Sequence, residues 1–132
     1  MLNAWLWDKH RMDVQWRRVR LGIFPTKEMA RMYMTMLRWA DAIYIKEGVV
    51  NIVEAKLRPM PGAIGQLELY QKLFRNTLEF KQYWKYPIRL TLLTSMPDTS
   101  MIELTSEKGI IYEIYTLEDV NIARRQRMQP VL

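Results

Sequence analysis

The sequence predicts an α/β fold with a mixed central β-sheet, an antiparallel hairpin within that sheet, and helices on both faces. The hairpin is indicated by two apolar, β-branched runs that only Glu47-Gly48 separates. These two runs cover residues 39–46 and 49–57. Further strand-like runs alternate with segments of helical periodicity, which is typical of a sheet covered by helices. These further runs lie at 14–21, 88–94 and 110–115.

The N-terminal part of the chain predicts two helices around a strand. Asn3 is expected to cap a first helix that runs to about Met12. Apolar and polar residues then alternate over 14–21, which favours a strand. Thr26 follows Pro25 and is expected to cap a second helix that ends near Arg38.

The hairpin sets the register of its two strands. Gly48 supplies the positive φ that a tight turn needs. A two-residue loop pairs Lys46 with Val49, and counting back along both strands places Asp41 opposite Glu54. Lys56 lies two residues beyond Glu54 and therefore projects from the same face.

A helix over residues 63–77 is predicted behind the hairpin, after the turn-rich connector 57–62. Its apolar stripe consists of Ala63, Leu67, Tyr70 and Phe74. Gln66 and Tyr70 are four residues apart and share one side of the helix, with Gln66 at the edge of the stripe. A short connector returns this helix across the sheet near the two carboxylates.

The C-terminal third predicts two strands and two helices. A helix over 100–108 with a Ser100/Glu103 capping box and a stop at Gly109 separates the strands 88–94 and 110–115. This order implies a right-handed parallel crossover. The last helix is expected over 118–128.

Composition limits the chemistry that the chain can perform. At 132 residues, the chain is expected to form a single domain over 1–132. It has no cysteine, which excludes disulfides and thiolate metal sites, and its one histidine, His10, is expected to be an ordinary surface residue. No apolar run approaches the roughly 20 residues of a membrane span, and no signal-peptide layout opens the chain, so a cytoplasmic location is expected.

The carboxylate pair suggests a site for a hard divalent cation. Two acids that face each other across a sheet repel unless something lies between them. A shared Mg²⁺ or Mn²⁺ removes this conflict, because hard cations prefer oxygen ligands. Lys56 can then stabilise an attacking hydroxide or the negative charge that develops on a phosphate.

These residues resemble the PD-(D/E)xK nuclease superfamily. The matching pattern is the acid Asp41 on one strand of a hairpin, Glu54-Ala55-Lys56 on the other, and a helix behind. Gln66 to Tyr70 resembles the QxxxY motif of the RecB-like and lambda-exonuclease-like branch. The resemblance implies a restriction-endonuclease-like core. It also implies Asp41, Glu54, Lys56, Gln66 and Tyr70 as catalytic residues, with the metal held by Asp41, Glu54 and the carbonyl of Ala55.

A second pair of similar motifs follows in the sequence. Glu79-Phe80-Lys81 repeats the (D/E)xK triplet and Gln82 to Tyr86 repeats QxxxY. Neither lies on a paired apolar hairpin, so order, register and context favour the first set.

The net charge of +6 favours a polyanionic partner, and beside an acidic metal site that partner is expected to be DNA rather than RNA. Basic side chains would bind the backbone without reading the sequence. The candidates are Arg17, Arg18, Arg20, Arg58, Lys81 and Lys85. A homo-oligomer or a partner protein is also expected, because a domain of this size cannot encircle DNA.

The predicted function is therefore a Mg²⁺- or Mn²⁺-dependent DNA nuclease with little sequence specificity. One alternative is a catalytically inactive nuclease-fold protein that binds DNA or serves as a phage head-completion or neck protein, which would be associated with the virion or the host cytoplasm. A nuclease acting on RNA is the other alternative.

Overall fold

The structure is a computed structural model that describes residues 1–22 and 38–128. Its centre is a five-stranded sheet in the order β1-β2-β3-β4-β5. The strands are β1 (Val14–Leu21), β2 (Arg38–Lys46), β3 (Val49–Lys56), β4 (Ile88–Thr94) and β5 (Ile111–Ile114). All five predicted strands are present. The helix predicted over 26–38 lies outside the described residues.

The sheet is mixed. β1, β2 and β3 are antiparallel neighbours, whereas β3, β4 and β5 are parallel. The β2–β3 turn has φ of 50° at Glu47 and 75° at Gly48, as expected for a two-residue hairpin in which both turn residues are left-handed. Lys46 pairs with Val49, which confirms the predicted register.

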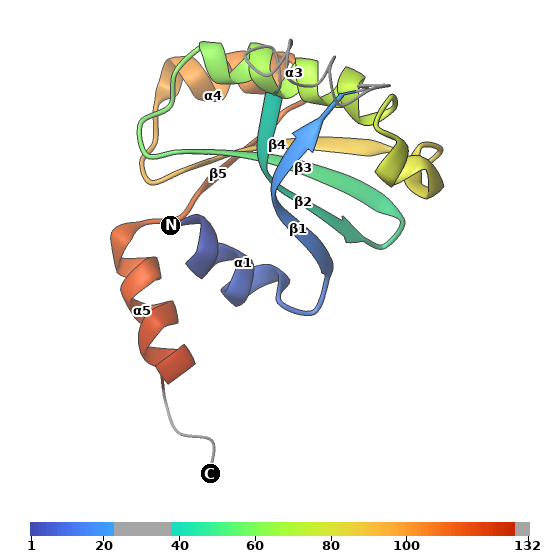
Figure 1. Ribbon diagram of the computed structural model, residues 1–132. Coiled ribbons are helices and arrows are strands. Elements are labelled where there is room, and N and C mark those ends of the chain that lie inside the picture. The colour runs from blue at the N-terminus through green and yellow to red at the C-terminus, as the bar shows by residue number, and fades with distance from the viewer. Residues whose placement is uncertain (23–37, 129–132) are drawn as a thin grey trace.

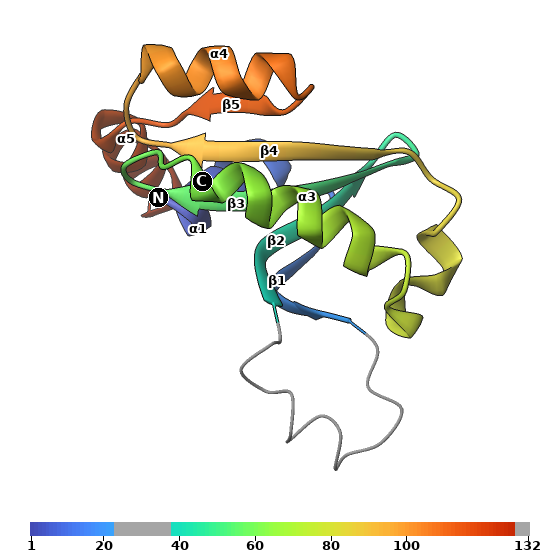
Figure 2. The same cartoon turned by 90° about the horizontal axis from the view of Figure 1, so that it is seen from above.

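Helices cover both faces of the sheet (Figure 1). They are α1 (Leu2–His10), α3 (Gly62–Phe74), the 3₁₀ helix η2 (Leu78–Tyr83), α4 (Thr99–Glu107) and α5 (Leu117–Met128). α3 and α4 lie on one face, and α1 and α5 on the other. Seen from above, α3 runs beside β4, whereas α4 lies over β5 (Figure 2).

Two apolar clusters hold these layers together. The first packs Ile43, Ile52 and Leu92 of the sheet against Leu67 and Phe74 of α3. The second packs Trp5 and Leu6 of α1 and Val120 of α5 against the opposite face of the sheet. Ala63, Leu67, Tyr70 and Phe74 are all buried, so the predicted stripe of α3 is correct.

Several helix boundaries differ from the sequence prediction; α3, for example, ends at Phe74 instead of residue 77. α4 begins at Thr99, and its cap is Asp98, whose Oδ1 accepts from Met101 N at 3.0 Å. The predicted Ser100/Glu103 box is therefore wrong, because a carboxylate two residues earlier already satisfies a free N–H of the first turn. α1 starts at Leu2, before the predicted cap Asn3, which instead accepts a hydrogen bond from Arg17.

His10 is buried, with 8% of its surface exposed, and the prediction of a surface histidine is wrong. Its ring stacks on Tyr44 at a centroid distance of 3.9 Å, and its Nδ1 lies 2.9 Å from Asp13 Oδ2. The cause is tertiary: α1 lies against the sheet and places the ring of its last residue on a strand tyrosine.

The α/β fold class and the hairpin within a mixed sheet are confirmed. Among the residues that the structure describes, no helix is both long enough and apolar enough to span a bilayer.

Candidate active site

The candidate site lies where β2 and β3 part. Their ladder extends from Lys46↔Val49 to Ala42↔Val53. One residue further, the Asp41 side chain replaces the backbone as acceptor, and its Oδ2 receives the Ala55 N–H at 2.8 Å. Asp41 is therefore held against the strand that carries Glu54, as the hairpin register predicts.

Glu54 is buried to an unusual degree for a carboxylate, with 4% of its surface exposed. Its Oε1 lies 3.5 Å from Lys56 Nζ, which is the ion pair expected for residues two apart on one strand face. Its Oε2 is buried and has no hydrogen-bond partner among the described residues. A buried carboxylate oxygen without a donor or cation costs free energy, and a cation bound at this atom would offset that cost.

Burial and charge together raise the pKa of Glu54 from 4.5 to about 7. Loss of solvation is the largest cause, and the nearby Asp41 carboxylate is the second. The Lys56 ammonium and the Tyr70 hydroxyl act in the opposite direction and lower the pKa. The two acids are thus close enough to interact, and a cation between them would relieve both causes of the raised pKa.

Tyr70 of α3 reaches the same place from above the sheet. Its hydroxyl donates to the Trp39 carbonyl at 2.9 Å, just before Asp41 on β2. That hydrogen bond, together with the effect of the hydroxyl on the Glu54 pKa, places Tyr70 between the first residues of β2 and the carboxylate of β3. Gln66 lies one turn earlier on α3 and is half-buried.

The donor set suits a small, hard cation. It comprises two carboxylates, and the described residues contain no cluster of three or more histidine, cysteine or acidic side chains. The Ala55 carbonyl could supply a further oxygen. The N–H and C=O of a strand residue point to the same side, and the Ala55 N–H points to Asp41.

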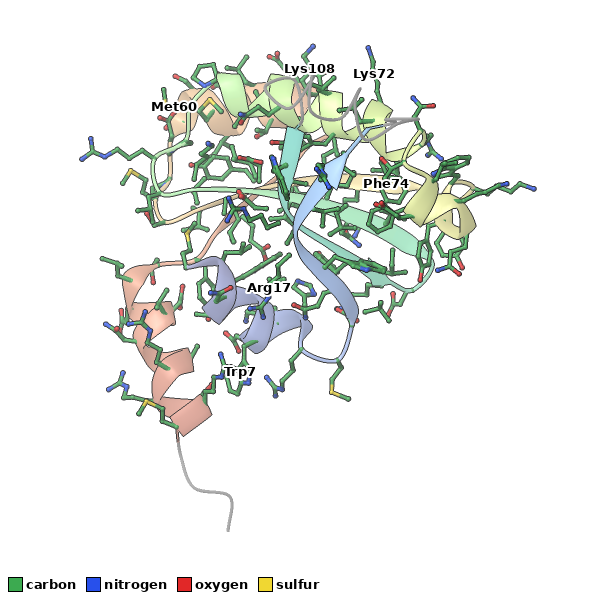
Figure 3. The ribbon with its side chains drawn as sticks, in the orientation of Figure 1. Trp7, Arg17, Met60, Lys72, Phe74 and Lys108 are labelled. Atoms are coloured by element: carbon green, nitrogen blue, oxygen red, sulfur yellow. The ribbon has the colours of Figure 1, made fainter. Side chains whose placement is uncertain are left out.

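The basic candidates of β1 have different partners. Arg17 Nη1 donates to Asn3 Oδ1 of α1 at 3.0 Å, so Arg17 reaches toward the α1 side (Figure 3). Arg18 and Arg20 instead lie over the ring of Trp39, each at 5.5 Å from its centroid.

The remaining basic candidates are exposed. Arg58 lies two residues after Lys56, the last residue of β3. Lys81 lies in η2, and Lys85 lies shortly before β4. The second (D/E)xK triplet thus falls in a 3₁₀ helix, where it has no facing strand acid.

Trp39 is the residue near the site that sequence reasoning missed. It is 45% exposed although it belongs to a strand, and it pairs with Arg20 across the β1–β2 ladder. A tryptophan two residues before the strand acid, facing an Arg-x-Arg run, was the available signal. It could be interpreted only once β1 was known to pair with β2.

By sequence, the chain matches no protein-family model and no curated protein. Its fold is similar to one in the crystal structure of a repair endonuclease from Pyrococcus abyssi, with a TM-score of 0.56 and 13% sequence identity. The likeness covers 87% of this chain and 45% of that chain, so the chain spans less than half of that protein. At this identity the comparison establishes a shared fold.

Proposed function

We propose that the protein is a divalent-metal-dependent DNA nuclease that hydrolyses phosphodiester bonds with little sequence specificity. The observation that carries the proposal is the buried Oε2 of Glu54, which lacks a partner among the described residues and belongs to a carboxylate that interacts with Asp41 and Lys56. A carboxylate maintained in this state is costly for folding alone and useful for binding a cation.

Asp41, Glu54 and the Ala55 carbonyl would hold Mg²⁺ or Mn²⁺. Such an ion supplies an activated water at neutral pH and neutralises charge on the scissile phosphate. The roles of these residues follow the PD-(D/E)xK pattern that the sequence resembles. The similarity of the fold to that of a repair endonuclease supports the same class of reaction.

The side chains around the carboxylates have separate roles in this proposal. The Lys56 ammonium, half-exposed beside Glu54, stabilises negative charge on the attacking oxygen or the phosphate. Tyr70 fixes the start of β2 against α3 and thereby positions Asp41. Gln66, half-buried one turn earlier, orients a phosphate oxygen or a water.

DNA is the proposed substrate because basic side chains flank the site and the chain carries a net charge of +6. Arg18 and Arg20 beside Trp39, and Arg58 after β3, are placed to bind phosphates near the carboxylates. Guanidinium–phosphate contacts position a nucleic acid without reading its bases, which accounts for low specificity.

Cleavage of plasmid and labelled oligonucleotides with Mg²⁺ or Mn²⁺ tests this function. We expect Lys56→Ala and Glu54→Gln each to lower the cleavage rate by roughly 100- to 1,000-fold, the usual loss when one electrostatic stabiliser is removed. Lys72→Ala removes an equal charge from the exposed side of α3 and should cleave like wild type. Equal rates for wild type and both site variants would contradict catalysis at this site, and faster cleavage of RNA than of DNA would contradict the substrate.

Metal titration separates this function from an inactive nuclease-fold protein. Mn²⁺ should raise the melting temperature of the wild-type protein because it binds the folded state. Absence of both cleavage and a Mn²⁺-dependent shift would favour the inactive alternative. The homo-oligomer or partner protein suggested by the sequence stays a prediction.

A further inference from the structure

An exposed tryptophan lies on β2, two residues before Asp41. Trp39 is the second residue of β2, and 45% of its surface is exposed. The guanidinium carbons of Arg18 and Arg20 lie 5.5 Å from the centroid of its ring. Direct contact between carbon atoms occurs at about 3.5–4.0 Å, so neither guanidinium is pressed against the centre of the ring.

The indole lies on the wall of a shallow hollow of about 400 Å³. Aromatic and basic side chains dominate this hollow, and one carboxylate joins them. The lining residues are Trp16, Arg17, Arg18, Val19, Arg20, Trp39, Glu79 and Phe80. Within the described part of the chain, neither Arg18 nor Arg20 has a carboxylate within ion-pair distance. Both guanidinium groups can therefore donate hydrogen bonds to phosphate groups.

The backbone at Arg18 is in a conformation that arginine rarely adopts. Its φ of 51° lies in the left-handed region, which costs about 1 kcal/mol or more for a residue with a side chain. Arg18 lies between the pairs Arg17↔Ala42 and Val19↔Ala40, and therefore across from Asp41. This conformation turns Arg18 toward Trp39, whereas Arg17 contacts α1.

Trp39 is attached directly to the candidate catalytic residues. Its carbonyl accepts the Tyr70 hydroxyl at 2.9 Å, and Asp41 follows two residues later on the same strand. Strand residues two apart are separated by about 7 Å, which is close to the spacing between successive phosphates of an extended nucleic acid strand. A base at Trp39 and a phosphate near Asp41 would thus be spaced along β2 like neighbouring groups of one strand.

We propose that Trp39 stacks against an unpaired base of single-stranded DNA while Arg18 and Arg20 bind the adjacent phosphates, so that the strand is led into the site. This inference rests on the proposed function and adds the form of its substrate. A duplex keeps the faces of its bases inside its own stack, whereas a single strand offers them to an aromatic ring. Arg18 and Arg20 then neutralise charge on the phosphate backbone of the DNA and make cation–π contacts with the indole ring.

Binding in EDTA tests the proposal without any cleavage. Fluorescence anisotropy would compare a labelled 20-nucleotide thymidine strand with a hairpin duplex of equal charge. Trp39→Ala should weaken single-strand binding by roughly 5- to 150-fold, the range that corresponds to removing the stacking of one base. Duplex binding should change far less, and Trp39→Phe should retain most of the single-strand affinity.

Trp7→Ala is the matched control, since Trp7 is a half-buried tryptophan on α1 that also lies against an arginine, with Arg11 at 4.6 Å. It should bind single strands like wild type (its position is labelled in Figure 3). An abasic strand of the same length keeps the phosphates and loses the bases. It should bind wild type and Trp39→Ala equally.

Two outcomes would contradict the stacking of a base on Trp39. The first is an unchanged single-strand affinity in Trp39→Ala, and the second is a loss of single-strand and duplex affinity by the same factor. Tighter binding of an RNA uridine strand of the same length would contradict DNA as the ligand of Trp39. Glu54→Gln, which removes the proposed catalysis, should keep the Trp39-dependent preference. If the Trp39-dependent preference for single strands is absent, the stacking proposal is refuted. If that preference is present but no DNA is cleaved, only the proposed nuclease function is refuted.

Discussion

At the scale of single residues, Glu54 is the unusual group of this protein. It combines nearly complete burial, a neighbouring acid and an ammonium at 3.5 Å. Burial in this form lowers stability whenever the group is charged, since water solvates a carboxylate better than this environment does. Such a cost at a position where glutamine would fit indicates a site selected for binding rather than for folding.

The Glu54 pKa predicts how stability depends on pH. Below pH 4.5 the carboxyl group is protonated in both folded and unfolded chains and carries no penalty. As pH rises from 4.5 to about 7, the unfolded chain releases this proton first, and the contribution of Glu54 to the free energy of unfolding falls by about 3 kcal/mol. In urea titrations without metal, the difference in stability between Glu54→Gln and wild type should therefore grow in favour of the variant across this range.

Parallel stability curves for the two proteins would contradict the raised pKa. Repeating the titration with Mn²⁺ gives a second comparison. The ion should stabilise wild type at pH 8 and leave Glu54→Gln nearly unchanged, since the variant has lost a charged ligand.

At the scale of elements, α3 secures the site by packing against the sheet. Its apolar stripe inserts Leu67 and Phe74 into the main core, and Tyr70 on the same side bonds to the start of β2. One row of side chains therefore does two things: it buries apolar area and it aligns β2 with β3. The Asp41–Ala55 hydrogen bond completes this alignment where the backbone ladder ends.

Phe74→Ala should destabilise the protein by roughly 3–5 kcal/mol, the usual cost of removing a fully buried aromatic ring. Phe74 is wholly buried, and its ring lies 5.0 Å from that of Phe80, centroid to centroid. Lys72→Ala on the exposed side of the same helix should stay within about 0.5 kcal/mol of wild type. Figure 3 shows these two positions on α3. Urea denaturation measures both, and similar losses of stability would show that the two sides of the helix were assigned wrongly.

At the scale of the whole molecule, basic side chains gather in separate places. Arg18 and Arg20 lie beside Trp39, whereas Arg124 and Arg125 lie on α5, on the face that α1 also covers. The net charge of +6 attracts nucleic acid to the molecule in general. The local arrangement decides which surface holds the strand.

Salt dependence distinguishes these surfaces. Removing both Arg18 and Arg20 by substitution with alanine should make the plot of log affinity against log salt concentration shallower by about 1.4 for single strands, at about 0.7 for each phosphate that is no longer neutralised. The paired change Arg124→Ala and Arg125→Ala removes the same charge from α5 and should leave the slope nearly unchanged. Equal slopes for the two double variants would show that binding depends on overall charge alone.

Much of the site was predictable because it depends on local rules. Side chains alternate along a strand and a two-residue turn fixes the pairing, so Asp41, Glu54 and Lys56 could be placed on one hairpin from their numbers. The periodicity of α3 likewise identified Tyr70 as a core residue. The Ser100 cap was predicted wrongly because two nearby residues competed for the same N–H groups.

Neighbours a few positions apart in the amino-acid sequence were thus enough to predict the five strands, the α-helices among the described residues and the hairpin register, but not the 3₁₀ helix η2. The tertiary structure alone decided that Glu54 is buried, that Tyr70 bonds to the Trp39 carbonyl, that His10 lies under a tyrosine ring, and that Arg18 and Arg20 flank an exposed indole. These features join distant segments, and loss of solvation depends on how completely those segments enclose a group.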